Sequence, residues 1–286
     1  MGFYFYEFIR FIADNMRGVS SKLNQLVDEK GRDYYDALQM RLKKISVEPS
    51  ISRIIGNYIY KLAAIPGLLF TYACDDANEN PYGALGIGML GLSASIHDDL
   101  NDTRPVNPAA YVNAGDVLLT EGFNIFVSEC HNSPNFAGAY AALALHTKRM
   151  WECQQMDMKF FGRSKVSKRE YLQNIARSRH MMKLGLVTAA VLTGRKIREY
   201  EIISDRFGNI LQILDDIGEV QEDKGNYCTY LSCNIDRFGP RKTKDIAKKM
   251  MREENDRLER HLQCKPNLLA FDKRLMKAVG KIQLSI

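Results

Sequence analysis

The sequence predicts an all-α protein, and three observations lead to that prediction. Apolar residues recur at helical spacing along most of the chain, alternating β-branched runs are nearly absent, and only 8 of the 286 residues are proline. A composition of 45% hydrophobic and 26% charged residues is ordinary for a globular protein that buries a core. Because no linker, internal repeat or low-complexity tract interrupts the pattern, we expect residues 1–286 to form a single domain, a bundle of roughly ten helices.

The first half of the chain contains four predicted helices. Phe5, Phe8, Ile9 and Ile12 follow the i, i+3, i+4, i+7 spacing of an amphipathic helix, and further aromatic residues surround them. Helices are then predicted over residues 23–42, 54–74 and 83–101. Pro66 lies inside the second of these ranges.

The second half continues the helical pattern in five longer segments. Residues 103–108, which contain two prolines, form the loop that precedes them. Helices are predicted over residues 109–130, 138–161, 168–192, 197–220 and 240–260. The predicted helices 83–101 and 197–220 both end in acidic residues, and the functional prediction depends on this shared feature.

Charge and hydropathy restrict the partners. The net charge of +6 favours an anionic substrate or a weak contact with a membrane surface. Lysines and arginines are spread along the chain, so we expect no nucleic acid partner. The longest apolar run, residues 83–96, is shorter than the roughly 20 residues of a membrane-spanning helix, and we therefore expect no transmembrane segment. The six cysteines form no CxxC pair and there is no signal peptide at the N-terminus, which indicates reduced thiols and a cytoplasmic location.

The first acidic cluster closes a very apolar predicted helix. Asp98, Asp99 and Asp102 stand at positions i, i+1 and i+4. Asp98 and Asp102 share one helix face, and Asp99 lies about 100° round the helix from Asp98. Carboxylates at the C-terminal end of a helix oppose the helix dipole. The cluster therefore calls for an external cation, and its oxygen ligands suit Mg²⁺.

The same arrangement recurs about 117 residues later, a spacing read from the residue numbers. Asp215, Asp216 and Glu219 close a second apolar helix, with Asp215 and Glu219 at i and i+4. One such cluster is weak evidence, because any exposed acidic turn can supply it. Two clusters that each close an apolar helix are hard to explain as solvated surface. Together the six carboxylates predict a site for several Mg²⁺ ions around a diphosphate.

These residues resemble the trans-isoprenyl diphosphate synthase (polyprenyl synthetase) family and its class I terpene synthase relatives. The two clusters resemble the family's two aspartate-rich motifs, and residues 115–119 (Gly-Asp-Val-Leu-Leu) match its GD-x-LL helix start. Gln154 and Asp157 match GQxxD, with Cys153 in place of the glycine, and Gln212 matches the glutamine of FQxxDD. The resemblance implies an all-α isoprenoid-synthase bundle around a deep apolar cavity, an allylic prenyl diphosphate substrate, Mg²⁺ dependence and a homodimer.

The departures from the family concentrate on one part of its site. The GGKRxRP motif, which binds isopentenyl diphosphate, is reduced to Lys61, and the loop after Asp102 is shortened and offers only Arg104. Ser178 and Arg179 replace the family's Lys-Thr pair. The resemblance leaves Arg104, Arg179, Lys224, Lys61 and Gln212 as candidate diphosphate ligands. Small Ser93 and Ala94, just before the first motif, imply a deep cavity for long prenyl chains, although small residues also serve tight helix packing.

The sequence thus predicts an enzyme that ionises an allylic prenyl diphosphate. Because two intact metal motifs accompany a dismantled site for the second diphosphate, the leading hypothesis is a terpene synthase on a prenyl diphosphate synthase scaffold. The first alternative is a prenyltransferase, which either elongates with isopentenyl diphosphate or prenylates another acceptor such as a peptide. The second alternative is an inactive regulatory partner subunit. Retention of all six acidic positions argues against that last alternative.

Overall fold

The computed structural model describes residues 28–45, 47–58, 62–103, 105–157, 165–219 and 229–280. These ranges contain helices and no strand, so the predicted all-α class is confirmed. The helices are α2 (Glu29–Lys43), α3 (Pro49–Tyr58), the 3-10 helix η1 (Leu62–Ala64), α4 (Ile65–Asp75), α5 (Ala84–Thr103), α6 (Pro108–Cys130), α7 (Phe136–Asp157), α8 (Lys168–Asn174), α9 (Ala176–Leu192), α10 (Ile197–Glu219), α11 (Tyr230–Phe238), α12 (Pro240–Leu262) and α13 (Pro266–Gly280).

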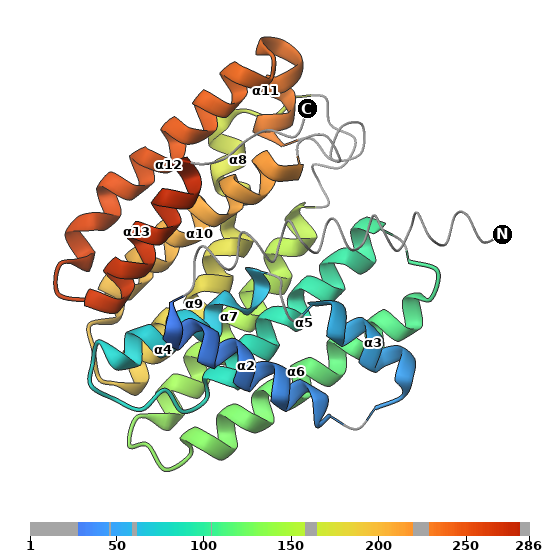
Figure 1. Cartoon of the computed structure of the whole chain (residues 1–286), viewed down its shortest axis with the longest axis vertical. Coiled ribbons are helices and arrows are strands. Elements are labelled where there is room, and N and C mark those ends of the chain that lie inside the picture. The colour runs from blue at the N-terminus through green and yellow to red at the C-terminus, as the bar shows by residue number, and fades with distance from the viewer. Residues whose placement is uncertain are drawn as a thin grey trace.

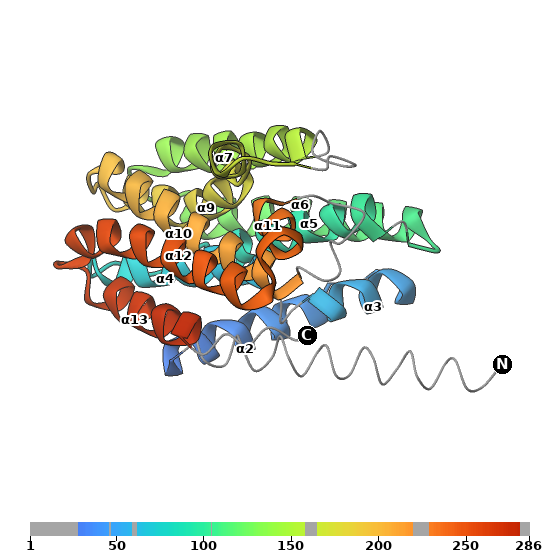
Figure 2. The same cartoon turned by 90° about the horizontal axis from the view of Figure 1, so that it is seen from above.

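The bundle is organised around α9, which packs against α10, α7 and α4 (Figure 1). Helix α5, which carries the first acidic cluster, packs along α6 and also touches α4 and α9. Viewed from above, α7 lies on one side of the molecule and α2, α3 and α13 lie on the opposite side (Figure 2). The helices that end in acid, α5 and α10, therefore both contact the central helix α9.

Close helix approach depends on small residues at two positions. A Cβ atom on Gly185 of α9 would lie 2.0 Å from the carbonyl oxygen of Pro66 on α4. A Cβ atom on Gly91 of α5 would lie 2.0 Å from the carbonyl oxygen of Ala63 in η1. These distances are far below contact distance, so the α4–α9 and α5–η1 packing requires glycine. Part of the small-residue content of α5 therefore serves helix packing.

Two long predicted helices are each divided in the structure. The range 54–74 contains the end of α3, then η1 and α4, and Pro66 lies in the first turn of α4, where its missing N–H leaves no hydrogen bond unmade. The range 168–192 is divided at Ile175 into α8 and α9. Ser167 begins α8 with a capping box that it forms with Glu170. The aromatic helix predicted around Phe5–Ile12 lies outside the described residues.

Two helices were not predicted from the sequence. Helix α11 begins at a capping box between Thr229 and Ser232, and it ends at Gly239, whose φ of 78° suits glycine. Helix α13 begins with Pro266 and buries Leu268, Phe271 and Leu275. The capping box of α11 has serine where glutamate or glutamine is usual, so the sequence signal was weak.

One hydrophobic core extends from Tyr34 in α2 to Val279 in α13. That continuity fits a single domain, which for the whole of 1–286 stays a prediction. Within the described ranges, no helix has the length and hydropathy needed to cross a membrane. Cys74, Cys130 and Cys153 are buried thiols, as expected. Cys233 is disulfide-bonded, so the expectation of uniformly reduced cysteines was wrong.

Candidate functional site

The first acidic cluster presents Asp98 to donors from two other helices. Asp98 lies near the end of α5, and its Oδ1 accepts a hydrogen bond from Nε2 of Gln154 on α7 at 3.1 Å. The same oxygen accepts a hydrogen bond from the guanidinium of Arg177 on α9, which forms an ion pair with it. The Arg177 and Asp98 side chains are 20% and 23% exposed, so the pair is open to solvent on one side.

Asp99 is held by a tyrosine from another helix. The hydroxyl of Tyr58, the last residue of α3, donates to Oδ2 of Asp99. Burial, followed by the nearby Asp99 carboxylate, raises the pKa of Tyr58, so this hydroxyl stays protonated and remains a donor. The second carboxylate of the cluster is therefore fixed in orientation by α3.

The second acidic cluster contains a more deeply buried carboxylate, Asp216, beside the partly exposed Asp215. Asp216 on α10 is only 7% exposed. It accepts hydrogen bonds from the hydroxyl of Tyr171 on α8 and, at 2.7 Å, from Nε2 of Gln212 one turn earlier on α10. The Gln212 amide oxygen in turn accepts from the hydroxyl of Ser178 on α9. Burial raises the pKa of Asp216 to about 7, although both hydrogen bonds act to lower it.

Arg177 connects the two clusters. It donates to Asp98 of α5, and its positive charge also lowers the pKa of Asp216 of α10. One guanidinium at the start of α9 therefore lies within electrostatic reach of both aspartate-rich segments, although these are more than a hundred residues apart in the sequence. Arg177 therefore pairs with Asp98 and acts electrostatically on Asp216, and a single metal site formed by the two clusters stays a prediction.

The donor set fits Mg²⁺ in its chemistry. Every candidate ligand is a carboxylate, the hard oxygen ligand that Mg²⁺ prefers, and the Arg177 cation already lies against one of them. Among the side chains that the structure describes, no group of three or more His, Cys, Asp or Glu is close enough together to hold a metal ion. The side chains of Asp102 and Glu219, which would complete each cluster, lie outside the described set.

Several other predicted residues cannot be placed. Lys61, Arg104 and Lys224 lie outside the described residues, and so does the side chain of Asp157. Arg179 can be placed, and its guanidinium donates to Oδ1 of Asn209 at 2.7 Å and to the carbonyl oxygen of Leu172 at 2.5 Å. These partners join α9 to α10 and α8, so Arg179 contacts none of the motif carboxylates whose side chains the structure describes.

The predicted cavity residues have different surroundings. Gln154 contacts Asp98, so it belongs to the carboxylate network. Ser93 is fully buried, and its hydroxyl donates to the carbonyl oxygen of Gly115 on α6 at 2.8 Å, while Ala94 is 4% exposed. These contacts show Ser93 serving the packing of α5 on α6. A deep apolar cavity beside Ser93 and Ala94 stays a prediction.

The GD-x-LL segment supports the first cluster from α6. A Cβ atom on Gly115 would lie 2.1 Å from the His97 ring, so the glycine makes room for that ring. His97 Nε2 lies 3.4 Å from Asp116 Oδ1, and its ring packs against Trp151 with centroids 4.8 Å apart. His97 therefore has packing and hydrogen-bonding partners beside Asp98, in agreement with a supporting rather than a catalytic histidine.

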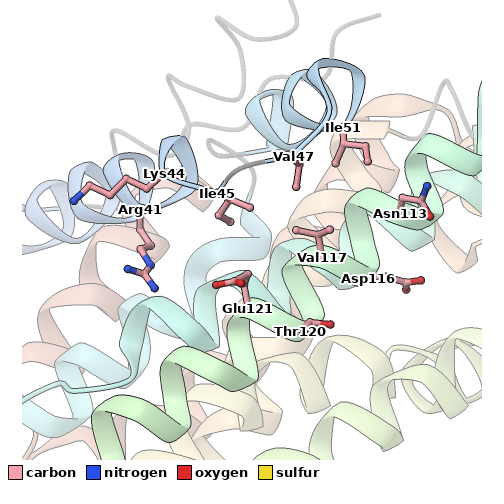
Figure 3. Close-up of a pocket in the computed structure, with 10 residues that line it drawn as sticks. All are labelled: Arg41, Lys44, Ile45, Val47, Ile51, Asn113, Asp116, Val117, Thr120 and Glu121. Atoms are coloured by element: carbon pink, nitrogen blue, oxygen red, sulfur yellow. The ribbon is translucent and has the colours of Figure 1, made fainter.

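A cavity of about 740 Å³ lies between α6 and the region where α2 is followed by α3 (Figure 3). Its walls are the segment that joins α2 to α3 and the outer face of α6. The lining residues are Arg41, Lys44, Ile45, Val47, Ile51, Asn113, Asp116, Val117, Thr120 and Glu121. None of the four predicted metal ligands whose side chains the structure describes lines this cavity.

Three functional candidates were not predicted from the sequence. Arg177, Tyr58 and Tyr171 all contact a motif aspartate, yet each comes from a different helix. The only sequence signal was the position of Arg177 next to the segment that replaces the Lys-Thr pair. The two tyrosines carry no local pattern that distinguishes them from core residues.

Known structures resemble the whole chain, whereas sequence comparison finds nothing. No family model and no curated protein matches the sequence. A geranylgeranyl pyrophosphate synthetase from the archaeon Geoglobus acetivorans superposes with a TM-score of 0.71 and 19% identity, over 90% of this chain and 99% of that one. A polyprenyl synthase from Caulobacter crescentus, solved with calcium and isoprenyl diphosphate, superposes with a TM-score of 0.70 and 16% identity. The match covers 91% of this chain and 98% of that one. A geranyltranstransferase from Thermotoga maritima superposes with a TM-score of 0.66 and 18% identity, over 88% of this chain and 97% of that one.

These superpositions establish the fold class of the chain. The chain has the all-α isoprenoid-synthase fold of the trans-isoprenyl diphosphate synthases, and the resemblance predicted from its motifs is confirmed at that level. At these identities the likeness establishes the fold, and the reaction is a matter for the proposal that follows.

Proposed function

We propose that this chain is a Mg²⁺-dependent prenyltransferase that acts on an allylic prenyl diphosphate. The observation that carries the proposal is the ion pair of Arg177 with Asp98 on α5, together with the electrostatic effect of the same guanidinium on Asp216 of α10. Two carboxylate clusters and a cation at one place suit a polyanionic group that binds through divalent metal. The proteins that share the fold are, by their names, synthases and transferases of prenyl groups, which supports the same substrate class.

The metal ligands in this proposal are the six acidic residues Asp98, Asp99, Asp102, Asp215, Asp216 and Glu219. Bound Mg²⁺ would neutralise the charge that develops on the departing diphosphate. The side chains of this chain orient the ligands: Gln154 fixes Asp98, Tyr58 fixes Asp99, and Gln212 with Tyr171 fixes Asp216. Arg177, together with Arg104, Lys61 and Lys224, would bind the diphosphate oxygens.

We favour transfer of the prenyl group to an acceptor over cyclisation of the allylic cation. The sequence alone favoured a terpene synthase, but the solved structures reported above are named as a geranylgeranyl pyrophosphate synthetase and a geranyltranstransferase, which supports transfer. Cyclisation stays the second candidate because the GGKRxRP motif and the arginine pair after the first cluster are absent. The same loss favours transfer to an acceptor that carries no diphosphate over elongation with isopentenyl diphosphate.

Product analysis tests the proposal. The purified protein would be incubated with Mg²⁺ and C10, C15 or C20 allylic diphosphates, each with and without isopentenyl diphosphate or a peptide acceptor. Products that require an acceptor would support transfer. Hydrocarbons or alcohols from the allylic substrate alone would establish cyclisation or hydrolysis instead. No release of diphosphate in any mixture would contradict both and favour a partner subunit.

We also propose a homodimer through the outer faces of α6 and α7. The two helices meet at a ring contact, with the centroids of Phe123 and Tyr140 5.8 Å apart. Their outer faces expose Val127 and Leu145. Exposed apolar side chains on adjacent helices suit a subunit contact. Light scattering after gel filtration should give a dimer that Leu145→Lys dissociates, whereas Ile197→Lys, also at an exposed apolar position, should leave it intact.

A further inference from the structure

Arg177 occupies a position that its own helix disfavours. It lies in the first turn of α9, which begins at Ala176. The N-terminal end of a helix carries partial positive charge, so a cation there is destabilising. That turn contains no acidic residue, and no side chain caps it. The first turn of α9 therefore supplies no negative charge to offset the unfavourable position of the Arg177 guanidinium.

The negative charge that offsets this unfavourable position comes from the two acidic clusters. Asp98, near the end of α5, provides the ion-pair partner, and Asp216, near the end of α10, lies within electrostatic reach. Carboxylates near helix C-termini are disfavoured for the opposite reason. Arg177 thus has a carboxylate partner on one neighbouring helix and a second carboxylate within electrostatic reach on another, in an arrangement that none of the helices would favour alone.

The pair is also placed where a metal ion would compete with it. The Asp98 oxygen that accepts from Arg177 is a carboxylate ligand in the proposed metal site. A divalent cation on that carboxylate would lie close to the guanidinium and repel it. Because both partners are about one-fifth exposed, Arg177 has solvent on one side into which it can turn.

We propose that Arg177 is an internal counter-ion that takes the place of metal while the site is empty, and that passes from Asp98 to the substrate's diphosphate when metal binds. This role rests on the proposed function. It makes metal and diphosphate binding interdependent, because metal displaces Arg177 from Asp98 and bound diphosphate offers the displaced guanidinium a stronger anionic partner. The diphosphate supplies that anion, through the bidentate contacts that a guanidinium makes with phosphate oxygens.

A purely structural ion pair predicts a different outcome. If Arg177 only joins α9 to α5, its removal loosens the site, and the affinities for metal and diphosphate fall together. If Arg177 competes with metal, its removal strengthens the binding of metal alone and weakens the binding of diphosphate. The opposite signs distinguish the two roles.

The test measures Mn²⁺ as a spectroscopic substitute for Mg²⁺, together with inorganic diphosphate, on the full chain. Electron paramagnetic resonance of free Mn²⁺ gives the metal affinity without diphosphate, and calorimetry gives the diphosphate affinity at saturating Mg²⁺. We expect Arg177→Gln to bind Mn²⁺ about tenfold more tightly and diphosphate about tenfold more weakly, as for one charge-assisted contact. Arg177→Lys, which keeps the charge, should keep the weak Mn²⁺ binding of the unmodified protein.

Arg206→Gln is the matched control. Arg206 also forms a partly buried ion pair, with Glu254 at 2.6 Å, but between α10 and α12. Its loss removes the same charge and should change neither affinity. Circular dichroism checks folding, and Arg177→Met, which keeps the apolar stem of the side chain, replaces Arg177→Gln if that variant does not fold.

The outcomes separate this inference from the proposed function. If the unmodified protein binds Mn²⁺ with diphosphate, but removal of Arg177 leaves Mn²⁺ affinity unchanged or lower, the counter-ion role is overturned and the proposed function stands. If the unmodified protein binds neither Mn²⁺ nor diphosphate, both are overturned. Tighter Mn²⁺ binding together with weaker diphosphate binding supports the role.

Discussion

The two acidic clusters share a sequence pattern but differ in their surroundings. Asp98 in the first cluster is partly exposed, and it is bound by a charged donor, Arg177, and an amide, Gln154. Asp216 in the second cluster is almost completely buried, and both of its hydrogen bonds come from neutral groups, Tyr171 and Gln212. The first cluster therefore presents an accessible carboxylate paired with a cation, whereas Asp216 of the second cluster is buried and held by neutral hydrogen-bond donors.

The same spacing of three acidic residues, at positions i, i+1 and i+4, therefore produces two kinds of ligand group. Burial raises the pKa of Asp216 to about 7, so its ionised form is destabilised in the metal-free protein. A nearby cation offsets that cost, which Arg177 does in part. We therefore expect the two clusters to have similar importance for turnover but different effects on stability.

The largest expected effect is on turnover. Asp98→Ala and Asp215→Ala should each lower kcat at least about 100-fold, because each removes a carboxylate that would hold metal against the diphosphate. Diphosphate release from the allylic substrate measures the rate, and circular dichroism confirms the helical fold. A variant with normal turnover would remove its cluster from the metal site.

Much of this site could be predicted from the sequence, because its acidic ligands stand in a local pattern. Periodicity gave most helices, and the spacing of Asp98 and Asp215 gave both clusters. Arg177 could not be predicted, since its role depends on α9 starting between the ends of two distant helices. Tyr58 and Tyr171 were missed for the same reason, as each reaches its aspartate from another helix. Arg179 shows the converse: its position fits the motif, but its side chain contacts Asn209.

The next expected effect concerns stability and pH. Asp216→Asn should raise the free energy of unfolding at pH 8 by on the order of 2 kcal/mol, because it removes the cost of a buried carboxylate. The sign follows from the pKa, which rises from 3.8 to about 7 on folding. The folded state then holds an extra proton below pH 7, and the stability that this gives is lost as the pH rises through 7. Urea unfolding at pH 5 and pH 8 measures the difference.

Two controls make that measurement specific. Asp98→Asn should not raise stability at pH 8, because it removes an ion pair from a partly exposed site. His146 and His180, in contact through Nδ1 atoms 3.2 Å apart, have pKa values lowered by burial from 6.5 to about 4. The stability that these neutral histidines contribute is lost as the pH falls from 6.5 to 4, a dependence opposite in sign to that of Asp216. This histidine effect is the same in every variant, so it cancels when variants are compared at one pH. Equal behaviour of the two asparagine variants would contradict the proposed difference between the clusters.

The smallest expected effect separates the two tyrosines. Tyr171→Phe should lower the free energy of unfolding by about 1–2 kcal/mol, because buried Asp216 then keeps only its bond from Gln212. Tyr58→Phe should cost about 0.5 kcal/mol, since Asp99 is partly exposed and water can replace the lost hydroxyl. Both substitutions remove one oxygen from one tyrosine, so each is the control for the other in urea unfolding at pH 8. A larger loss for Tyr58→Phe would mean that the first cluster is the better shielded of the two, and the comparison would have to be reversed.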